Sequence, residues 1–164
     1  MSSQPAWLPA LLLLSASGGD WQRYVEAIHA AFRADFITDH PEFEGRRCAC
    51  KRHPMMDGKE ATFWHLISEG GVETDRLPDL RRCERIRWPR AMIERSPDQL
   101  RVWRSERAGD HRIVIALPDF SYVVVLADRR DYVLLWTAYC VEHEHRRAKL
   151  RKECERAKTS WGRP

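Results

Sequence analysis

The sequence contains no internal repeat, no low-complexity segment and no apolar run long enough to cross a membrane. Its most apolar stretch, residues 6–15, resembles the core of a signal peptide, but no Lys or Arg precedes it and Pro9 interrupts it. We therefore expect these residues to form a buried N-terminal arm, within residues 1–19, rather than an export signal. These absences argue against a membrane partner and favour a cytoplasmic location.

A paired cysteine framework is also missing, because the five cysteines are odd in number and irregularly spaced. Unpaired thiols are typical of proteins in the reducing cytoplasm. Cys48, Cys50, His53 and Cys83 form an alternative zinc set, but paired ligands in structural zinc sites are usually separated by about two to four residues. We therefore expect no metal and no other cofactor, and metal analysis of the purified protein tests the zinc alternative.

Neither sign of charge dominates the composition. The net charge is +4 with 32% charged residues and an isoelectric point near 8.9, which permits nucleic-acid binding without requiring it. A chain of 164 residues with 43% hydrophobic residues is sufficient for one compact domain with a core. These bulk properties leave the oligomeric state open.

Helical spacing of apolar residues marks the first part of the domain, residues 20–96. Apolar residues three and four apart predict an amphipathic helix over residues 20–37, with Asp20 as its N-cap. His29 lies beside the apolar stripe of this helix, and we expect it to have a structural role. A short helix-like segment follows at residues 59–70.

Three further boundaries follow from glycine, proline and charge. The short helix at residues 59–70 is expected to stop at Gly70 and Gly71. Pro89 should prevent one unbroken helix over residues 78–95. Residues 142–157 are rich in charge and predict a peripheral C-terminal helix.

From residue 100 onward the pattern changes to β-rich runs. Runs at 113–117, 122–126 and 132–136, with partial alternation after residue 100, are joined by short links. Short links between neighbouring strands indicate hairpins, so residues 100–140 predict a four-stranded antiparallel meander. The expected fold is therefore α+β, with the N-terminal helices packed on one face of this meander and a charged C-terminal helix.

Two segments carry the residues that metal-independent RNA cleavage requires. That reaction needs a base, an acid and groups that stabilise the phosphate. His65 and Lys59 lie in the short helical segment, and strand alternation places Thr137 and Tyr139 on one side of the last strand, shared with Val133 and Leu135. Each also has an ordinary structural interpretation, so the hypothesis requires that the two segments meet.

An arginine-rich stretch supplies candidate phosphate and base contacts. Arg85 could bind phosphate at the reaction centre, while Arg87 could bind phosphate and Trp88 could stack on a base. His53 lies close to the short helical segment and is a further candidate for substrate binding. The alternative interpretation of the arginines is a solvated surface.

Together these segments resemble a known family. The residues concerned are GDW (19–21), DFI (35–37), GKEATFWH (58–65), DLRRCERIRW (79–88) and LWTAY (135–139). They resemble a family of small bacterial proteins associated with phages and mobile elements, which is similar to the barnase/EndoU/colicin/RelE-like nuclease superfamily. The resemblance covers nearly the whole chain.

The resemblance implies a sheet-based ribonuclease that acts as a toxin or phage-defence effector. It points to His65 and Lys59, to the segment 85–87, and to Thr137 with Tyr139. Its implied partners are an RNA substrate and an antitoxin or immunity protein.

Two hypotheses therefore follow from the sequence. The first is a ribonuclease that forms a 2′,3′-cyclic phosphate by general acid–base catalysis at His65. The second is a noncatalytic module that binds RNA or protein on the same scaffold. Substitution of His65 discriminates between them, because only the first requires the imidazole.

Overall fold

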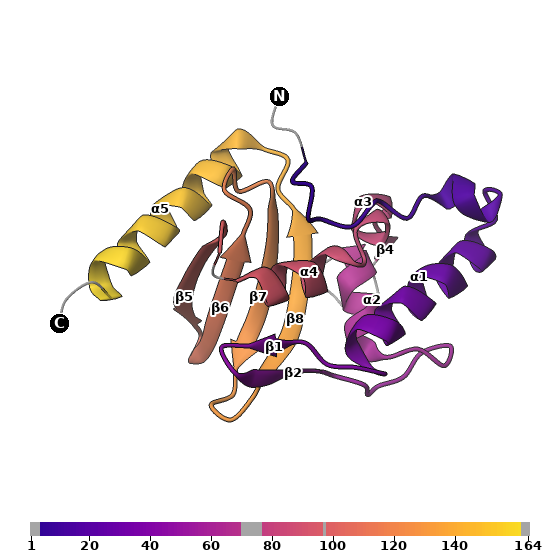
Figure 1. Ribbon diagram of the computed structural model, residues 1–164, viewed down its shortest axis with the longest axis horizontal. Helices are drawn as coiled ribbons and strands as arrows, with labels where there is room; N and C mark the ends of the chain where they lie inside the picture. The colour runs from indigo at the N-terminus through magenta and orange to yellow at the C-terminus, as the bar shows by residue number, and fades with distance from the viewer. Residues whose placement is uncertain (1–3, 70–76, 97, 162–164) are drawn as a thin grey trace.

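A computed structural model of the chain describes residues 4–69, 77–96 and 98–161. In chain order the described elements are the 3-10 helix η1 (Leu14–Ser17), α1 (Trp21–Phe36), β1 (Glu42–Phe43), β2 (Arg46–Cys50), α2 (Ala61–Ile67), β3 (Ser68–Glu69), β4 (Leu77–Pro78), α3 (Leu80–Glu84), α4 (Trp88–Arg95), β5 (Arg101–Arg107), β6 (Asp110–Ala116), β7 (Tyr122–Asp128), β8 (Val133–Cys140) and α5 (Glu144–Trp161). Figure 1 shows these elements as an α+β arrangement around one large sheet.

The prediction of a four-stranded antiparallel meander is wrong, because the large sheet has six strands and is mixed. Its order is β1-β2-β8-β7-β6-β5, and β2 runs parallel to β8 with Cys48 opposite Val133. The other described neighbours in this sheet are antiparallel. Short links reveal only strands that are neighbours along the chain, so they could not reveal the pairing of β2 with a strand far downstream.

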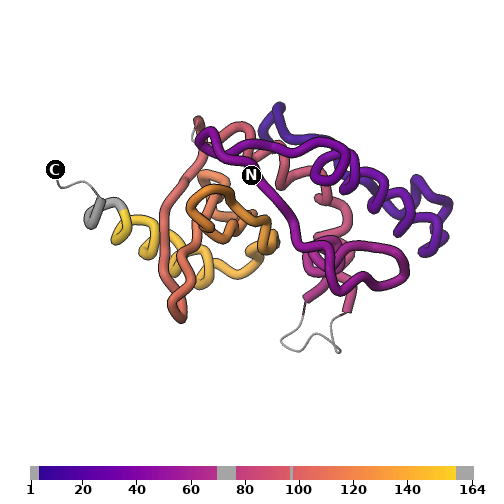
Figure 2. The backbone as a smooth tube through the Cα atoms, turned by 90° about the horizontal axis from the view of Figure 1, so that it is seen from below, coloured from indigo at the N-terminus to yellow at the C-terminus, as the bar shows by residue number. Residues whose placement is uncertain are grey.

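Helices cover both faces of the sheet, with α1–α4 packed on one face and α5 on the other. The larger core lies between the sheet and α1–α4 and contains side chains from α1, α2, α3 and α4. A second core on the opposite face contains Trp103, Val123 and Cys154, so α5 packs there. Trp103 Nε1 also donates to Glu153 at 2.9 Å. In Figures 1 and 2 the two groups of helices lie at opposite sides of the molecule.

Strand β8 contains an extra residue that reverses the expected alternation. Val125 pairs with Thr137 and Leu126 with Leu135, so Trp136 has no partner in the β7–β8 ladder. As a result Ala138 follows Leu135 onto the face covered by α1–α4. The prediction that Thr137 and Tyr139 share the face of Val133 and Leu135 is therefore wrong, since Tyr139 packs with the core on the α5 face.

Several local predictions are confirmed. Helix α1 begins after Asp20, whose carboxylate accepts from Arg23 N at 3.1 Å. The segment 78–95 is divided into α3 and α4, although Pro89 lies in the first turn of α4 and the break falls at residues 85–87. The expected helix stop at Gly70 and Gly71 lies outside the described residues.

The remaining local outcomes concern the two ends of the chain. In the N-terminal arm Leu8 is buried in the larger core. The C-terminal helix extends to Trp161 and makes a core contact through Cys154 instead of being peripheral. Within the described ranges no helix has both the length and the apolar character needed to cross a membrane.

Candidate functional site

Helix α2 is fixed between the end of β2 and the side of β8. Ala61 N and Thr62 N donate to the carbonyls of Arg52 and Lys51, and the Thr62 hydroxyl accepts from Lys51 N at 2.7 Å. The helix packs beside β8, as Figure 1 shows. The two sequence segments proposed to meet therefore do meet, but the two ends of α2 have different surroundings.

The N-terminal end of α2 is tied to α1 by one ion pair and one buried hydrogen bond. Lys59 is 6% exposed, and its Nζ donates to Glu26 Oε1 at 2.6 Å. Glu60 and His29 are both buried and lie 2.6 Å apart. Burial alone would raise the pKa of Glu60, but hydrogen bonds and the nearby positive charge of His29 lower it. Lys59, which was predicted to be catalytic, therefore belongs to the polar contacts that join α1 to the start of α2.

The C-terminal end of α2 is tied to α3 and β8 by Arg82. Its Nη1 donates to the carbonyl of Ser68 at 2.7 Å and to that of His65 at 3.4 Å. The same guanidinium stands 5.9 Å from the centre of the Tyr139 ring. His65 itself is half-buried. One arginine thus connects the turn that carries His65 with the strand that carries Tyr139.

Tyr139 has cationic surroundings. Burial raises its pKa above the ordinary value, with a smaller contribution from Glu153, while the positive charges of Arg146, Arg82 and Arg107 act in the opposite direction. The phenol therefore stays protonated and can donate a hydrogen bond. Arg107 and Arg146 are exposed, so a bound anion could reach them.

Thr137 lies on the face of β8 that carries Tyr139. Both residues are half-buried, and the bulge at Trp136 is what brings this part of the strand to the α5 face. Trp136 is 41% exposed, and the Arg112 guanidinium lies 5.7 Å from its ring centre. An exposed aromatic ring therefore precedes the two hydroxyl-bearing residues along the strand.

The other predicted residues lie elsewhere. Arg85 stacks over Trp88 at 5.0 Å, and Trp88 is buried, with Nε1 donating to the Pro9 carbonyl at 2.9 Å. Trp88 therefore cannot stack on a base without a rearrangement of the core. Arg87 is exposed beside a hollow of about 620 Å³ between the N-terminal arm and α1. His53 is exposed in the loop before α2.

The alternative zinc set is not assembled. Cys48 and Cys83 are buried in the core, Cys50 is half-buried, and burial raises the pKa values of these thiols to about 12, 12 and 11 in that order. Thiols must lose their protons to bind zinc, which such surroundings oppose. No group of three or more potential metal ligands occurs in the part of the chain that the structure describes.

A second polar region lies at the opposite end of the sheet, where a cleft of about 500 Å³ opens. We call it the arginine cleft. It is lined by Arg46, Arg104, Ser105, Glu106, His111, Arg112, Asp128 and Arg130. Glu106 and His111 lie directly opposite each other on β5 and β6. Four arginines face two carboxylates here, so the lining favours anions.

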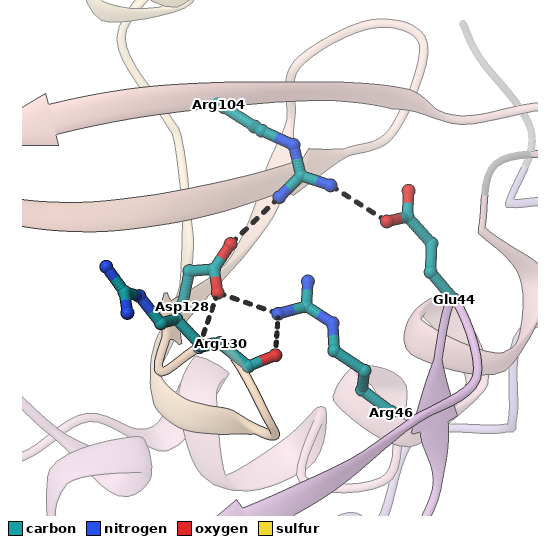
Figure 3. A network of polar contacts seen from close by, with 5 residues as sticks. All are labelled: Glu44, Arg46, Arg104, Asp128 and Arg130. Carbon is teal, nitrogen blue, oxygen red and sulfur yellow. Dashed lines mark hydrogen bonds and ion pairs between the residues drawn. The ribbon is translucent and has the colours of Figure 1, made fainter.

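Asp128 organises the arginine cleft, as Figure 3 shows. Its two carboxylate oxygens accept from Arg46 Nη1 at 2.7 Å and from Arg104 Nη1 at 3.1 Å. Arg104 Nη2 also donates to Glu44 at 2.8 Å. The hydrogen bond from Arg46 lowers the pKa of Asp128 despite partial burial, which keeps this carboxylate ionised. Two guanidinium groups are thereby held in fixed orientations.

Sequence reasoning missed several of these residues. Arg82 stood within the quoted motif at residues 79–88, but nothing in the sequence distinguished it from Arg85. Arg107, Arg112 and Arg146 lie on three separate elements, and only the folded chain brings Arg107 and Arg146 near Tyr139 and Arg112 beside Trp136. Comparisons with protein-family models, with curated proteins and with solved structures found no match. Any functional assignment therefore rests on the chemistry of the residues themselves.

Proposed function

We propose that this protein is a metal-independent ribonuclease whose reaction takes place where the end of α2 meets β8. The observation that supports it is the position of Arg82, which bonds the carbonyl of His65 and stands over the ring of Tyr139. A turn carrying an imidazole and a strand carrying a phenol are thereby fastened to one guanidinium. The proposal keeps the reaction type expected from the sequence and revises its site.

The reaction proceeds by internal attack within the RNA. A base removes the proton of the 2′-hydroxyl, and the 2′-oxygen attacks the phosphorus. The bond between phosphorus and the 5′-oxygen breaks, and an acid protonates that oxygen as it leaves. The products are a 2′,3′-cyclic phosphate and a free 5′-hydroxyl. Hydrogen-bond donors and cations stabilise the negative charge that develops on the phosphate oxygens.

In this proposal His65 transfers the proton, as base or acid, because imidazole titrates near neutral pH. The hydroxyl groups of Tyr139 and Thr137 donate to the phosphate, and the protonated state of Tyr139 suits that role. Arg107 and Arg146 supply positive charge from β5 and α5. Arg82 acts as a positioning residue, since its side chain is only 13% exposed and its contacts are to the protein.

Two residues that the sequence placed in the catalytic site make structural contacts elsewhere. Lys59 holds α2 to α1 through Glu26, and Arg85 covers the buried ring of Trp88. Neither contact places its cation beside Tyr139. The proposed site therefore contains His65, Thr137 and Tyr139 from the predicted catalytic set.

The experiment is RNA cleavage by the purified protein with EDTA present. The wild type should produce fragments ending in a 2′,3′-cyclic phosphate. His65→Ala should lower the rate about 10²- to 10⁴-fold, as expected for loss of a general acid or base. His145→Ala, which removes an exposed histidine from α5, is the matched control and should retain full activity. Circular dichroism and thermal unfolding establish that the variants are folded.

A second variant tests the strand side of the site. Tyr139→Phe keeps the ring under Arg82 and removes only the hydroxyl, so the fold should persist while cleavage falls about tenfold. Tyr132→Phe, at an exposed tyrosine before β8, is its control. Intact RNA across single-stranded, structured and transfer RNAs would contradict the proposal. Cleavage that depends on His111 instead of His65 would also contradict it, because the reaction would then belong to the arginine cleft.

The biological part of the proposal is that cleavage makes the protein a toxin or defence effector with a cognate antitoxin or immunity protein. Expression in bacteria should then arrest growth with the wild type and not with His65→Ala at equal protein levels. Equal growth arrest by both would indicate binding without catalysis, which is the noncatalytic alternative.

A further inference from the structure

The arginine cleft contains guanidinium groups that protein contacts already hold in place. Asp128 and the Arg130 carbonyl both accept from Nη1 of Arg46. Within the described residues these contacts leave Nη2 and Nε of the same guanidinium to donate to a ligand. Side-chain exposures of 21% for Arg46 and 29% for Arg104 leave both groups accessible. Because these groups are already held in place, binding costs little loss of rotamer freedom.

Arg130 adds a cation that the Asp128 network does not use. Its side chain is exposed, and Figure 3 shows it pointing away from the Asp128 carboxylate. Only its backbone takes part, with the amide donating to Asp128 Oδ1 at 3.0 Å and the carbonyl accepting from Arg46. The cleft thus receives an oriented guanidinium from Arg46 on β2 and an extended one from Arg130 in the turn before β8.

Arg112 connects the cleft with an exposed aromatic ring. It lines the cleft, and its guanidinium lies 5.7 Å from the ring centre of Trp136. Trp136 immediately precedes Thr137 on β8, which belongs to the proposed reaction site. Cation, aromatic ring and hydroxyl groups therefore follow one another from the cleft toward Tyr139.

This order of groups decides which kind of anion fits. A simple phosphate or an inorganic polyphosphate would use the arginines but has nothing to place on Trp136. A nucleic-acid strand with unpaired bases offers both phosphates for guanidinium groups and flat rings for stacking. Bases in a duplex are already stacked on each other, so they are not available to the tryptophan.

We propose that the arginine cleft and Trp136 form a binding track for single-stranded RNA that leads to the reaction site at Tyr139. Phosphates bind at Arg46, Arg112 and Arg130, and a base stacks on Trp136. The inference rests on the proposed function for the identity of the polymer as RNA, but binding is measured separately from cleavage.

The test is fluorescence anisotropy with a labelled single strand of 2′-O-methyl RNA about 12 nucleotides long. Such a strand has no 2′-hydroxyl and cannot undergo the proposed cleavage, so loss of binding and loss of catalysis are separable. Affinity is measured at several salt concentrations for the wild type, Arg112→Gln/Arg130→Gln and Trp136→Ala. The matched control is Arg23→Gln/Arg33→Gln, which removes equal charge from the exposed face of α1.

Loss of the two cleft arginines should weaken binding and lower the slope of log affinity against log salt by about 1.4, since each phosphate contact on a single strand contributes about 0.7. Trp136→Ala should weaken binding about five- to hundredfold with little change in that slope. The control pair should leave the slope within error of the wild type. Arg130→Gln alone, at an exposed side chain, gives the same direction if the double variant folds poorly.

Three results would overturn the inference. The first is an equal fall in affinity for the α1 control, which would show that only net charge matters. The second is competition by inorganic polyphosphate as strong as by RNA together with no effect of Trp136→Ala. The third is tighter binding of a duplex than of the single strand. Absence of cleavage with binding intact would reject the proposed ribonuclease and leave the track in place.

Discussion

The two ends of helix α2 contain similar residue types in opposite arrangements. At its start, the buried side chains of Lys59 and Glu60 are paired with Glu26 and His29 of α1, and Glu26 is the one exposed member of the four. At its end, His65 is half-buried beside an arginine that contacts β8. The helix is seven residues long, which is about 10 Å. Closeness in sequence therefore did not indicate a shared role.

The contrast follows from what each end touches. The start of α2 meets another helix, and polar groups enclosed there must be paired because an unpaired buried charge is costly. The end of α2 meets the open side of β8 beyond its pairing with β2, where the described ladder ends at Leu135. Polar side chains there can remain partly accessible. The comparison predicts that one end governs stability and the other governs activity.

The largest effect on cleavage should come from comparing one variant at each end of α2. His65→Gln should lower RNA cleavage by at least about 100-fold with little change in the melting temperature, since the side chain is half-buried and a polar group remains. Lys59→Met should retain most of the cleavage activity while lowering the melting temperature. Initial rates and thermal unfolding on the same preparations measure both. Loss of activity in folded Lys59→Met would return Lys59 to the reaction site.

A smaller effect, on stability, is expected from a substitution in the buried pair of Glu60 and His29. Glu60→Gln keeps the size of the side chain but removes the charge that faces His29 at 2.6 Å, so the free energy of unfolding should fall by about 2 kcal/mol. Cleavage at low temperature, where the variant is folded, should be unchanged. Urea denaturation measures the difference, and an unchanged free energy would mean that this pair does not hold α1 and α2 together.

The smallest effect is a dependence on pH of the difference in unfolding free energy between the wild type and Glu60→Gln. The folded state lowers the pKa of Glu60 below its ordinary value of 4.5, so the charged carboxylate stabilises the fold fully above that value. Its contribution is lost as the pH falls below about 4.5 through the lower folded pKa. The free-energy gap between wild type and Glu60→Gln should therefore narrow as denaturation is repeated from pH 6 toward about pH 3. A gap that widens on acidification would reverse the assigned direction.

Local patterns in the sequence predicted the parts of the fold that form between near neighbours. The apolar spacing and Asp20 cap of α1 are properties of consecutive residues. The pairing of β2 with β8 depends on residues far apart, and Arg46 and Arg47 make β2 look unlike a sheet interior. The bulge at Trp136 leaves no mark in a run of apolar and aromatic residues, and it alone reversed the faces assigned to Thr137 and Tyr139.

Local sequence patterns were also insufficient to identify all residues of the proposed reaction site. His65 and Tyr139 could be chosen as candidates from their residue types alone. An imidazole can transfer a proton and a phenol can donate a hydrogen bond. The partner that removed Lys59 from the set, Glu26, lies 33 positions earlier on another helix. The Arg112–Trp136 contact joins β6 to the bulge, so no spacing rule could have connected them.

The parallel pairing of β2 with β8 also sets an order in which the protein can assemble. Cys48 and Val133 are 85 positions apart (133 minus 48), and closing a loop of that length costs about 4 kcal/mol of chain entropy. The β7–β8 hairpin closes a far shorter loop and can form first. Because the start of α2 is hydrogen-bonded to the residues just after β2, its C-terminal end reaches β8 only after this late closure. A chain that has not yet completed β8 therefore lacks the junction of α2 and β8 at which we propose that cleavage takes place.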